Sequence, residues 1–179
     1  MFLSGKKVDL RGFEKSDIGP YKQWLHDSEV TFFLEMGDRP QRDKEVDDLW
    51  QTVSQDDNSV LFAMVEKNEG KLIGICGLVQ ISAIHRRAQL NILIGEKDFW
   101  GKGCGKDACS LLVGYSFNKL NLNSVQLGVN SANTRAVRAY ESIGFVFEGK
   151  RRAFIYRNGK YYDTSLYSIL RSEYVNSLD

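Results

Sequence analysis

Hydrophobic and polar residues alternate along several stretches of this chain, and short helical patterns separate most of them. Alternation with a period of two is typical of strands, because successive side chains of a strand point to opposite faces. The predicted strands are Val8–Phe13, Ser59–Glu66, Lys71–Ser82, Ala88–Ile94, Val125–Val129, Phe145–Gly149 and Tyr161–Leu170. The segment Lys67-Asn68-Glu69-Gly70 predicts a hairpin turn between the second and third of these strands.

The helical patterns place apolar residues three or four positions apart, on one face of each helix. Ser16 is expected to cap the first helix, with Gly19 and Pro20 in its first turn. The second helix covers roughly Asp43–Val53 and the third Asp107–Leu120. The positions expected to be buried on the first and third helices are Ile18, Tyr21, Leu25, Ala108, Leu111, Leu112 and Tyr115.

A fourth helix is expected after Asn133 or Thr134, either of which can serve as its N-cap, and Gly144 fits the C′ position at its end. Its buried face consists of Ala136, Tyr140 and Ile143. This order of strands and helices predicts a mixed α/β (α+β) fold in one domain, residues 1–179. The sheet is expected to be mostly antiparallel, with helices on its faces.

A glycine-rich run, Phe99-Trp100-Gly101-Lys102-Gly103-Cys104-Gly105-Lys106, joins the strand Ala88–Ile94 to the third helix. Glycine lets backbone N–H groups approach an anion, and the start of a helix adds free N–H groups and a positive dipole end. Lys102 and Lys106 add positive charge. The expected ligand is a diphosphate, held by the N–H groups from Gly101 to Lys106. A glycine-rich connection without a ligand explains the run equally well.

The spacing of this run excludes two known phosphate-binding loops. A P-loop needs glycine five positions before its Gly-Lys pair and a hydroxyl residue after it, but Trp100 and Asp107 occupy those positions. A Rossmann fingerprint that starts at Gly101 needs glycine or alanine at Lys106 and an acidic residue about 20 residues later. The chain near that distance reads Asn121-Leu122-Asn123.

The composition fits one globular domain with a sizeable core, since 42% of the residues are hydrophobic. Lys and Arg number 24 and Asp and Glu 23, so the formal net charge is +1, which argues against nucleic acid as a partner. No apolar run approaches the roughly 20 residues of a membrane span. The segment from Met1 to Lys7 lacks the features of a signal peptide, so the expected location is the cytoplasm.

The chain has three cysteines, Cys76, Cys104 and Cys109, with no paired metal-ligand spacing, so we expect neither a metal site nor a disulfide framework. Cys76 lies in an apolar strand and is expected to be a small core residue. Cys104 lies inside the predicted diphosphate loop, where a redox role is less expected than simple occupancy of a variable position.

A second run of interest follows the glycine loop further along the chain. It reads Val129-Asn130-Ser131-Ala132-Asn133-Thr134-Arg135-Ala136-Val137-Arg138-Ala139-Tyr140-Glu141-Ser142-Ile143-Gly144-Phe145. Together the two runs resemble the GNAT superfamily of N-acetyltransferases, in the branch of ribosomal-protein alanine acetyltransferases and spermidine acetyltransferase. His85-Arg86-Arg87-Ala88 and the run from Arg157 to Asp163 also match. The resemblance covers Val8 to about Tyr174.

The resemblance implies a sheet that is split at the cofactor site and acetyl-CoA as the cofactor. The pantetheine arm is expected to lie along the central strand, against backbone groups near Asn91, Ile92 and Leu93, because its amides can pair with a free strand edge. Asn133 matches the family asparagine that contacts this arm, and it can cap a helix at the same time. Tyr140 matches the family tyrosine that donates a proton to the departing thiolate; without the resemblance it is a core aromatic.

No general base follows from the resemblance. Many relatives carry a glutamate on the central strand at the position of Gln89, and neither Gln89 nor Asn91, on the same face, can act as a base. His26, Glu35, His85 and a water chain are the alternatives. A surface histidine is the more ordinary interpretation of either histidine.

The acceptor amine stays open between polyamines, amino-sugar nucleotides, aminoglycosides and protein N-termini. We take His26, Phe32, Glu35 and His85 as candidate acceptor-binding residues; Phe32, with Phe33 and Met36, lines an apolar pocket or packs the core. The acidic residues between Asp43 and Asp57 either attract a polyamine or form a solvated helix face, and the second interpretation carries more weight.

The resulting prediction is a cytoplasmic, acetyl-CoA-dependent N-acetyltransferase that acts on a primary amine by direct transfer in a ternary complex. The alternatives are a non-catalytic acyl-CoA sensor, which Gln89 keeps open, and transfer of a longer acyl group. Relatives are often homodimers, and the tyrosine-rich C-terminal stretch supplies either an interface or core.

Overall fold

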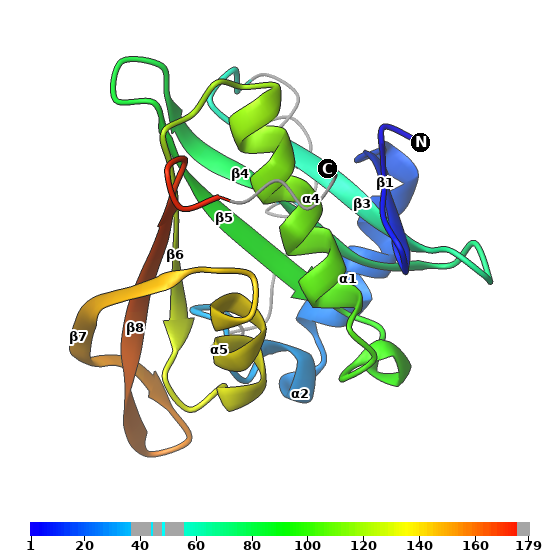
Figure 1. Ribbon diagram of the computed structural model, residues 1–179. Helices are drawn as coiled ribbons and strands as arrows, with labels where there is room; N and C mark the ends of the chain where they lie inside the picture. The colour runs from blue at the N-terminus through cyan, green and yellow to red at the C-terminus, as the bar shows by residue number, and fades with distance from the viewer. Residues whose placement is uncertain (37–43, 45–47, 49–55, 175–179) are drawn as a thin grey trace.

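A mixed sheet forms the centre of the computed structural model, which describes residues 1–36, 44, 48 and 56–174 (Figure 1). The sheet order within this part of the chain is β1-β2-β3-β4-β5-β6-β8-β7, and every neighbouring pair is antiparallel except β5 and β6. The strands are β1 (Leu3–Ser4), β2 (Val8–Gly12), β3 (Val60–Glu66), β4 (Leu72–Ser82), β5 (Arg87–Ile94), β6 (Ser124–Asn130), β7 (Val146–Arg157) and β8 (Lys160–Leu170).

The helices lie on both faces of this sheet. They are α1 (Ile18–Leu25), α2 (Ser28–Thr31), α4 (Cys104–Asn118) and α5 (Thr134–Glu141), with short 3₁₀ turns η1 (Lys15–Asp17) and η2 (Lys97–Phe99). The predicted fold class, a mostly antiparallel sheet between helices, is confirmed. The predicted helix Asp43–Val53 and its acidic residues lie almost wholly outside the described residues.

Two strand predictions need correction. Sequence alternation missed the short edge strand β1, and it ended the strand after Phe145 at Gly149, whereas β7 continues to Arg157. The register of β7 shifts twice against β8, by one extra residue between Phe147 and Gly149 and by two between Arg151 and Ile155. Ala153, in the second shift, has a φ of 49°, and these extra residues break the simple alternation. The other predicted strands are present within one or two residues of their expected limits.

The helix starts also differ from the sequence prediction in two places. Ser16 is not a cap: Glu14 precedes the turn η1, and the Asp17 carboxylate accepts a hydrogen bond from the Glu14 N–H at 2.8 Å. The helix after the glycine run begins at Cys104 instead of Asp107. Asn133 is the cap of α5, because its Oδ1 accepts from the Ala136 N–H at 3.2 Å.

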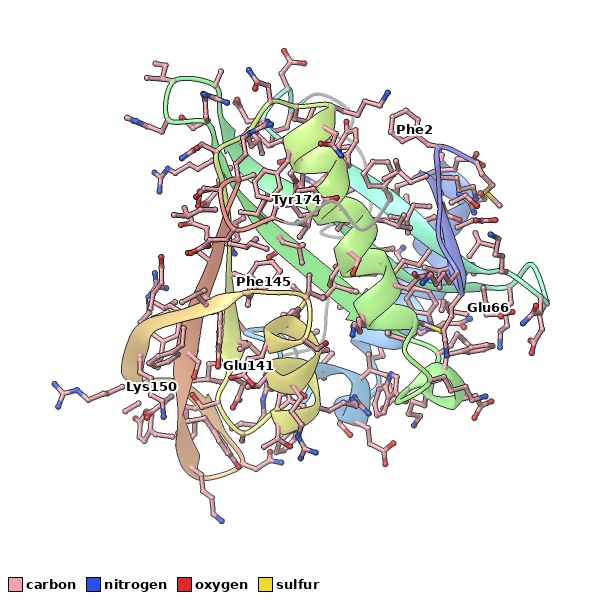
Figure 2. The ribbon with its side chains drawn as sticks, in the orientation of Figure 1. Phe2, Glu66, Glu141, Phe145, Lys150 and Tyr174 are labelled. Atoms are coloured by element: carbon pink, nitrogen blue, oxygen red, sulfur yellow. The ribbon has the colours of Figure 1, made fainter. Side chains whose placement is uncertain are left out.

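The apolar core is divided by the sheet into two parts. On one face, α4 and α5 pack on Leu78, Leu90 and Leu127; on the other, α1 and α2 pack on Ile75 and Leu93. Further side-chain contacts involve Phe2 and Glu141, which Figure 2 labels. Phe2 stacks on Phe62, and Tyr167 of β8 donates a hydrogen bond to Glu141 at 3.0 Å.

The β5–β6 pair is the one parallel contact in the described sheet, and it is short. It joins residues 87–89 to residues 124–126, and the two strands then separate, as Figure 1 shows. The strands β4 and β8 continue to pair with the outer edges of β5 and β6 beyond that point. The sheet therefore contains a gap between Leu90–Ile94 and Leu127–Asn130, with α5 in front of it.

None of the described helices is long and apolar enough to cross a membrane.

Gly95, directly after β5, is a packing constraint that can be tested. A Cβ at this position would overlap the ring of Trp24, which is buried and donates a hydrogen bond to Glu96 at 3.0 Å. We expect Gly95→Ala to lower the free energy of unfolding by roughly 1–3 kcal/mol in urea denaturation followed by circular dichroism. Gly19→Ala is the control: nothing lies within 4 Å, and an alanine in α1 should be neutral or stabilising by about 0.5 kcal/mol. Equal effects of the two substitutions would contradict this packing.

Candidate active site

The glycine run forms a tight connection between β5 and α4. Gly101 and Gly103 have φ angles of 73° and 86°, in the left-handed region that favours glycine. Gly105 lies in the first turn of α4, and a Cβ there would come within 3.2 Å of the Ile94 side chain. Glycine at these positions therefore sets the path of the loop and lets α4 begin directly against β5.

The first turn of α4 presents backbone donors without partners in the helix. Gly103 is the N-cap and supplies no side-chain hydrogen bond, and the first bond of this turn runs from the Asp107 N–H to the Gly103 carbonyl at 3.0 Å. The N–H groups of Cys104, Gly105 and Lys106 have no partner inside the helix, because the residues four positions before them precede its N-cap. The turn can therefore bind an anion through its N–H groups and its dipole.

A cavity of about 390 Å³, here called the loop cavity, begins at this turn. Gly101, Gly103, Gly105 and Lys106 line one end of it, and residues of α5 line the side opposite β5. Two residues that were expected to contact the ligand, Lys102 and Cys104, do not line this cavity. The Cys104 side chain is buried, and the Lys102 ammonium lies over the Phe99 ring at 5.1 Å. Their backbone groups remain in the loop.

The gap in the sheet exposes one edge of β5. The Gly95 N–H donates to the Ile73 carbonyl of β4 at 2.9 Å. In an antiparallel pair, residues that bond to the partner alternate with residues that do not. The register therefore directs the N–H and C=O groups of Leu93 and Asn91 to β4.

Ile92 and Leu90 direct their backbone groups the other way, into the gap. The Ile94 carbonyl confirms this alternation, because it accepts a hydrogen bond from the Trp100 indole at 2.8 Å and does not pair with β4. Of the three residues predicted to offer backbone groups to a ligand, Ile92 is thus the one whose N–H and C=O face the gap. Asn91 and Leu93 contribute side chains to a second cavity.

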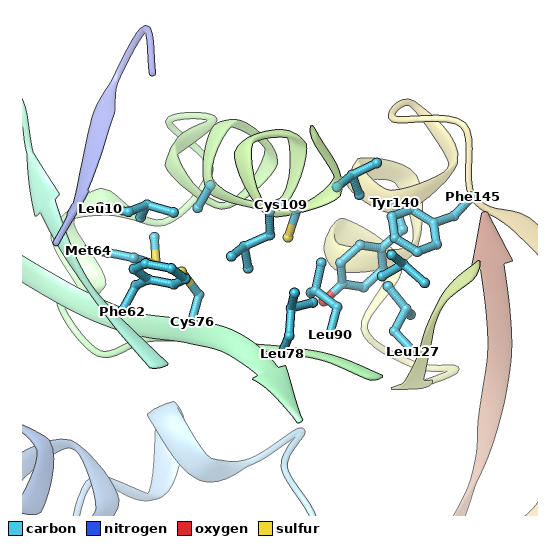
Figure 3. Close-up of a cluster of buried hydrophobic side chains, with 14 of the residues drawn as sticks. Leu10, Phe62, Met64, Cys76, Leu78, Leu90, Cys109, Leu127, Tyr140 and Phe145 are labelled. Atoms are coloured by element: carbon cyan, nitrogen blue, oxygen red, sulfur yellow. The ribbon is translucent and has the colours of Figure 1, made fainter. Parts of the chain in front are cut away.

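Tyr140 of α5 lies at the inner end of the loop cavity. Its side chain is 9% exposed, and Figure 3 shows the phenol extending from α5 toward Leu90, close to Cys109. None of the described residues hydrogen bonds to its hydroxyl. Burial raises the pKa of Tyr140 above its ordinary value, so the hydroxyl keeps its proton at neutral pH and is available as a donor.

The three cysteines are all buried free thiols, which confirms Cys76 as a core residue. Burial raises the pKa of Cys109 to about 12, and it raises the pKa values of Cys76 and Cys104 as well. Because the thiolate is the nucleophile, none of these side chains is activated at neutral pH. Cys109 lines the loop cavity beside Tyr140 as a small apolar wall residue.

A second cavity, of about 620 Å³ and here called the sheet cavity, lies along the sheet face that α1 covers. It meets the loop cavity at the gap, where six residues line both: Phe33, Leu34, Ile92, Leu93, Asn133 and Tyr140. Polar side chains form much of the sheet cavity's floor. Gln89 and Asn91 are joined by a hydrogen bond of 3.2 Å, and Gln126 lies on β6 next to them.

Two buried polar atoms of the sheet cavity lack partners among the described residues. They are Asn130 Nδ2 and Thr164 Oγ1, which belong to directly paired residues of β6 and β8, each 2% exposed. Asn130 Oδ1 already accepts the Ala132 N–H at 3.0 Å, so its Nδ2 is left as a donor toward the cavity. Buried polar atoms are rarely unpaired in a folded protein, which favours a bound polar molecule in this cavity.

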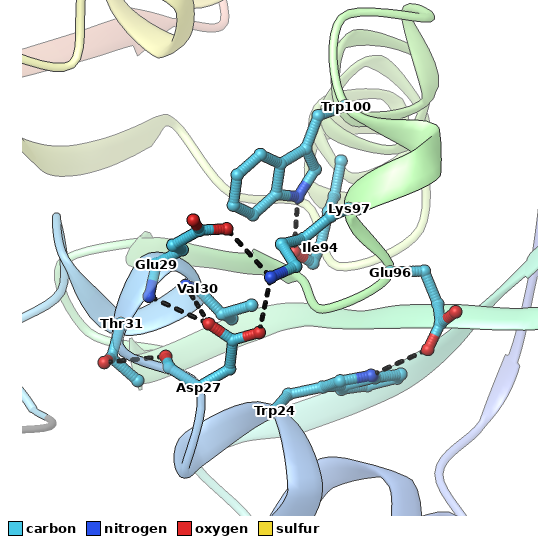
Figure 4. Close-up of polar contacts among 9 residues, drawn as sticks. All are labelled: Trp24, Asp27, Glu29, Val30, Thr31, Ile94, Glu96, Lys97 and Trp100. Atoms are coloured by element: carbon cyan, nitrogen blue, oxygen red, sulfur yellow. Dashed lines mark hydrogen bonds and ion pairs between the residues drawn. The ribbon is translucent and has the colours of Figure 1, made fainter.

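A network of polar contacts holds α2 against the segment that leads into the glycine loop (Figure 4). The Lys97 ammonium of η2 forms ion pairs with Asp27 and Glu29 at 2.8 Å each. Both carboxylates raise the pKa of Lys97, and Asp27 has the larger effect. Asp27 also caps α2 by accepting the Glu29 N–H at 2.9 Å. Because Glu29 and Val30 line the loop cavity, the network positions one of its walls.

The four candidate acceptor-binding residues lie in different places. Glu35 is exposed and lines the sheet cavity. Phe32 contacts the rings of Phe33 and Tyr162 and lines neither of the two cavities. Its neighbour Phe33 lines both. His26 is exposed at the end of α1 and His85 in the β4–β5 turn, and neither lines the loop cavity or the sheet cavity.

Several residues of this site did not emerge from the sequence. Arg135 and Arg138 line the loop cavity from one face of α5, and the Arg135 guanidinium lies 4.8 Å from the centre of the Trp100 ring. Lys7 reaches the loop from the β1–β2 turn, and its ammonium donates to the Lys102 carbonyl. The three-residue spacing of the two arginines could have indicated a shared face, whereas the approach of Lys7 depends on the fold.

These features suit a long ligand with a diphosphate at one end and amides along its length. The open N–H groups of α4, with Lys7 and Lys106 nearby and Arg138 lining the same cavity, suit the diphosphate, and the Ile92 edge suits an amide. Among the described residues, no three His, Cys, Asp or Glu side chains gather where they could hold a metal ion.

Comparison with known proteins agrees with this geometry. The family model described as "Acetyltransferase (GNAT) domain" matches residues 7–146. A spermidine N(1)-acetyltransferase of Vibrio cholerae is 38% identical over 120 residues, which cover 67% of this chain and 69% of the relative.

Two solved structures of spermidine N-acetyltransferase from Vibrio cholerae share the fold. One, in complex with CoA and spermine, has a TM-score of 0.86 at 29% identity and covers 95% of this chain and 99% of its own. The other, a dodecameric structure in an intermediate state, has a TM-score of 0.80 at 29% identity and covers 97% and 99%. The predicted resemblance is therefore confirmed, and the chain belongs to the GNAT family of acetyl-CoA-dependent N-acetyltransferases.

Proposed function

We propose that this protein transfers an acetyl group from acetyl-CoA to a primary amine of a polyamine. The observation that carries the proposal is the meeting of the two cavities at Tyr140, through the gap between β5 and β6. One cavity suits a phosphorylated thioester and the other has a polar, partly acidic lining. A gap in the sheet lets reactants approach from opposite faces, so that their reacting atoms come together.

The acyl donor is expected in the loop cavity. The N–H groups of Gly103 to Lys106 and the charges of Lys7, Lys106 and Arg138 would hold its diphosphate. The backbone of Ile92 and the Nδ2 of Asn133 would pair with its amides. When bound, acetyl-CoA supplies the acetyl group as a thioester, whose carbonyl oxygen can accept a hydrogen bond from a β5 N–H in the gap.

The acceptor is expected in the sheet cavity. Its described lining includes three carboxyl side chains, Glu35, Asp56 and Glu148, and one cation, Arg151. The Ser59 hydroxyl, which donates to Asp56 at 2.6 Å, lowers the pKa of Asp56, so this group is ionised at neutral pH. Separated carboxylates suit a substrate with several ammonium groups, and the spermidine acetyltransferases among the relatives favour the same class.

Transfer is expected to be direct, in a ternary complex. None of the three cysteine thiols is ionised at neutral pH, so no described cysteine is poised to carry the acetyl group. The Tyr140 hydroxyl, protonated and without a partner among the described residues, can donate a hydrogen bond to the sulfur as the carbon–sulfur bond breaks.

Substitution of Tyr140 by phenylalanine tests this role. Because the hydroxyl has no described partner, Tyr140→Phe should leave the free energy of unfolding within about 1 kcal/mol of the parent protein. We expect kcat to fall by about 10²-fold while KM for acetyl-CoA is unchanged. Steady-state kinetics and thermal unfolding would measure both effects. An unchanged kcat in the folded variant would remove Tyr140 from the mechanism.

A panel of acceptors tests the function itself. Thiol release from acetyl-CoA should be seen with spermidine and spermine, and should be weaker with amino-sugar nucleotides, aminoglycosides and peptides with free N-termini. Mass spectrometry of the product would show one added acetyl group. Release with peptides alone would move the acceptor to protein N-termini. Folded protein that binds CoA and acetylates nothing in the panel would favour the acyl-CoA sensor, and release with longer thioesters alone would change the donor.

We also propose that the protein is a homo-oligomer. The support is the dodecameric spermidine acetyltransferase of similar fold, together with large apolar side chains that β7 and β8 leave exposed, among them Phe154, Tyr156 and Tyr161. Light scattering coupled to gel filtration should give a mass of several chains at micromolar concentration. The mass of one chain across the accessible concentration range would contradict this assignment.

A further inference from the structure

The wall between the two cavities is a short irregular segment that has little structure of its own. The helix α2 ends at Thr31, and the residues that follow it, Phe33 to Met36, line the sheet cavity. Phe33 and Leu34 line the loop cavity as well. The segment has no strand partner among the described residues, so side chains from elsewhere must fix its position.

Arg157, from the distant end of β7, makes the contacts that fix it. Its Nη2 donates to the Leu34 carbonyl at 2.9 Å and to the Met36 carbonyl at 2.7 Å. The Phe32 ring lies edge-on to Tyr162 of β8, with 6.1 Å between ring centres. Both contacts come from the β7–β8 hairpin, which is 121 to 130 residues away in the chain.

The hairpin presents Arg157 in a defined place. Arg157 pairs with Lys160, and the two residues between them, Asn158 and Gly159, have φ angles of 50° and 81°. Two positive φ angles in an Asn-Gly pair are typical of a type I′ turn, which matches the twist of the paired strands. Arg157 is therefore the last residue of a rigid ladder instead of part of a free loop.

The guanidinium is committed to this contact. It is partly buried, and its Nε has no hydrogen-bond partner among the described residues. A charged donor that is shared between two carbonyl groups in a partly buried position makes a stronger bond than a fully exposed one. Removing it would leave two carbonyls without their donor and release the segment between Leu34 and Met36.

We propose that Arg157 is a positioning residue for acceptor binding, which holds the Phe33–Met36 wall in the shape that receives the amine substrate. The inference rests on the proposed function for the identity of that substrate. It assigns no contact between Arg157 and either reactant, because Arg157 lines neither cavity. The donor is expected to depend less on this wall, since the proposed site of its diphosphate lies at the glycine loop and α4.

The test compares Arg157→Met with Arg152→Met, which makes the same change of charge on the same strand. Arg152 is exposed and hydrogen bonds to no described residue. With spermidine as the amine and saturating acetyl-CoA, Arg157→Met should raise KM for spermidine by about tenfold. The Kd for CoA should change by less than about twofold. Arg157→Lys, which keeps a cation with three donors, should recover part of the lost affinity.

Hydrogen exchange makes the test independent of turnover. Peptides that contain residues 32–36 should exchange faster in Arg157→Met than in the parent protein or in Arg152→Met. Unchanged exchange there, or an unchanged KM, would overturn the proposal, and so would an equal rise of KM in Arg152→Met. A parent protein that acetylates no amine would instead contradict the proposed function, and the exchange experiment would then decide whether Arg157 fixes the wall.

Discussion

The early separation of β5 from β6 is the constraint on which the rest of the site depends. Backbone N–H and C=O groups inside a protein are normally paired, so two adjacent strands that stop pairing create an unsatisfied edge. Here pairing stops after Gln89, and the edge of β5 continues through Ile92. A ligand with its own amide groups can satisfy this edge as an added strand would. The fold thus places a polar, strand-like binding site through the middle of an otherwise apolar sheet.

The same constraint explains why the glycines are needed where they are. A ligand that lies against β5 must have its charged end near the strand's carboxyl end, where α4 begins. Gly105 lets α4 start within van der Waals contact of Ile94, and Gly103 turns the chain without placing a Cβ or a capping side chain over the free N–H groups. A serine or aspartate cap would satisfy the helix from within and remove the anion site. The Asp107 carboxylate lies in the first turn of α4, where a negative charge favours the positive end of the helix dipole, and it accepts the Lys7 N–H at 2.7 Å.

The features that could be predicted from the sequence are those that depend only on residues close together in the chain. The strand before the glycine run, the cap at Asn133 and the positive φ of Gly144 follow from neighbouring residues alone. Phe33 and Met36 were named from the sequence as lining a pocket or packing the core, and both line the sheet cavity. The contacts that hold their segment could not be predicted, because the Leu34 and Met36 carbonyls accept hydrogen bonds from Arg157 on the far hairpin. The Asn158-Gly159 pair is typical of a tight turn, yet only the fold brings its neighbour Arg157 to the segment that follows α2. His26 and His85 were considered from the sequence because histidine is suited to acid–base catalysis, but both lie outside the two cavities.

In the proposed reaction, the acceptor amine must lose a proton before it attacks, so the groups that can accept this proton matter for the rate. An aliphatic ammonium has a pKa near 10, so at neutral pH most of the substrate cannot attack, and some group must accept its proton. Gln89 and Asn91 cannot do so, and Tyr140 is held protonated by burial. The described groups in the sheet cavity that can accept a proton are the carboxylates Glu35, Asp56 and Glu148, which lie with Asn130 and Thr164 around the same space. Asn130 Nδ2 and Thr164 Oγ1, which lack partners among the described residues, are suited to order water in this cavity. In the proposed mechanism, proton removal would therefore run through this water on one face of the sheet, while Tyr140 would assist the sulfur on the other.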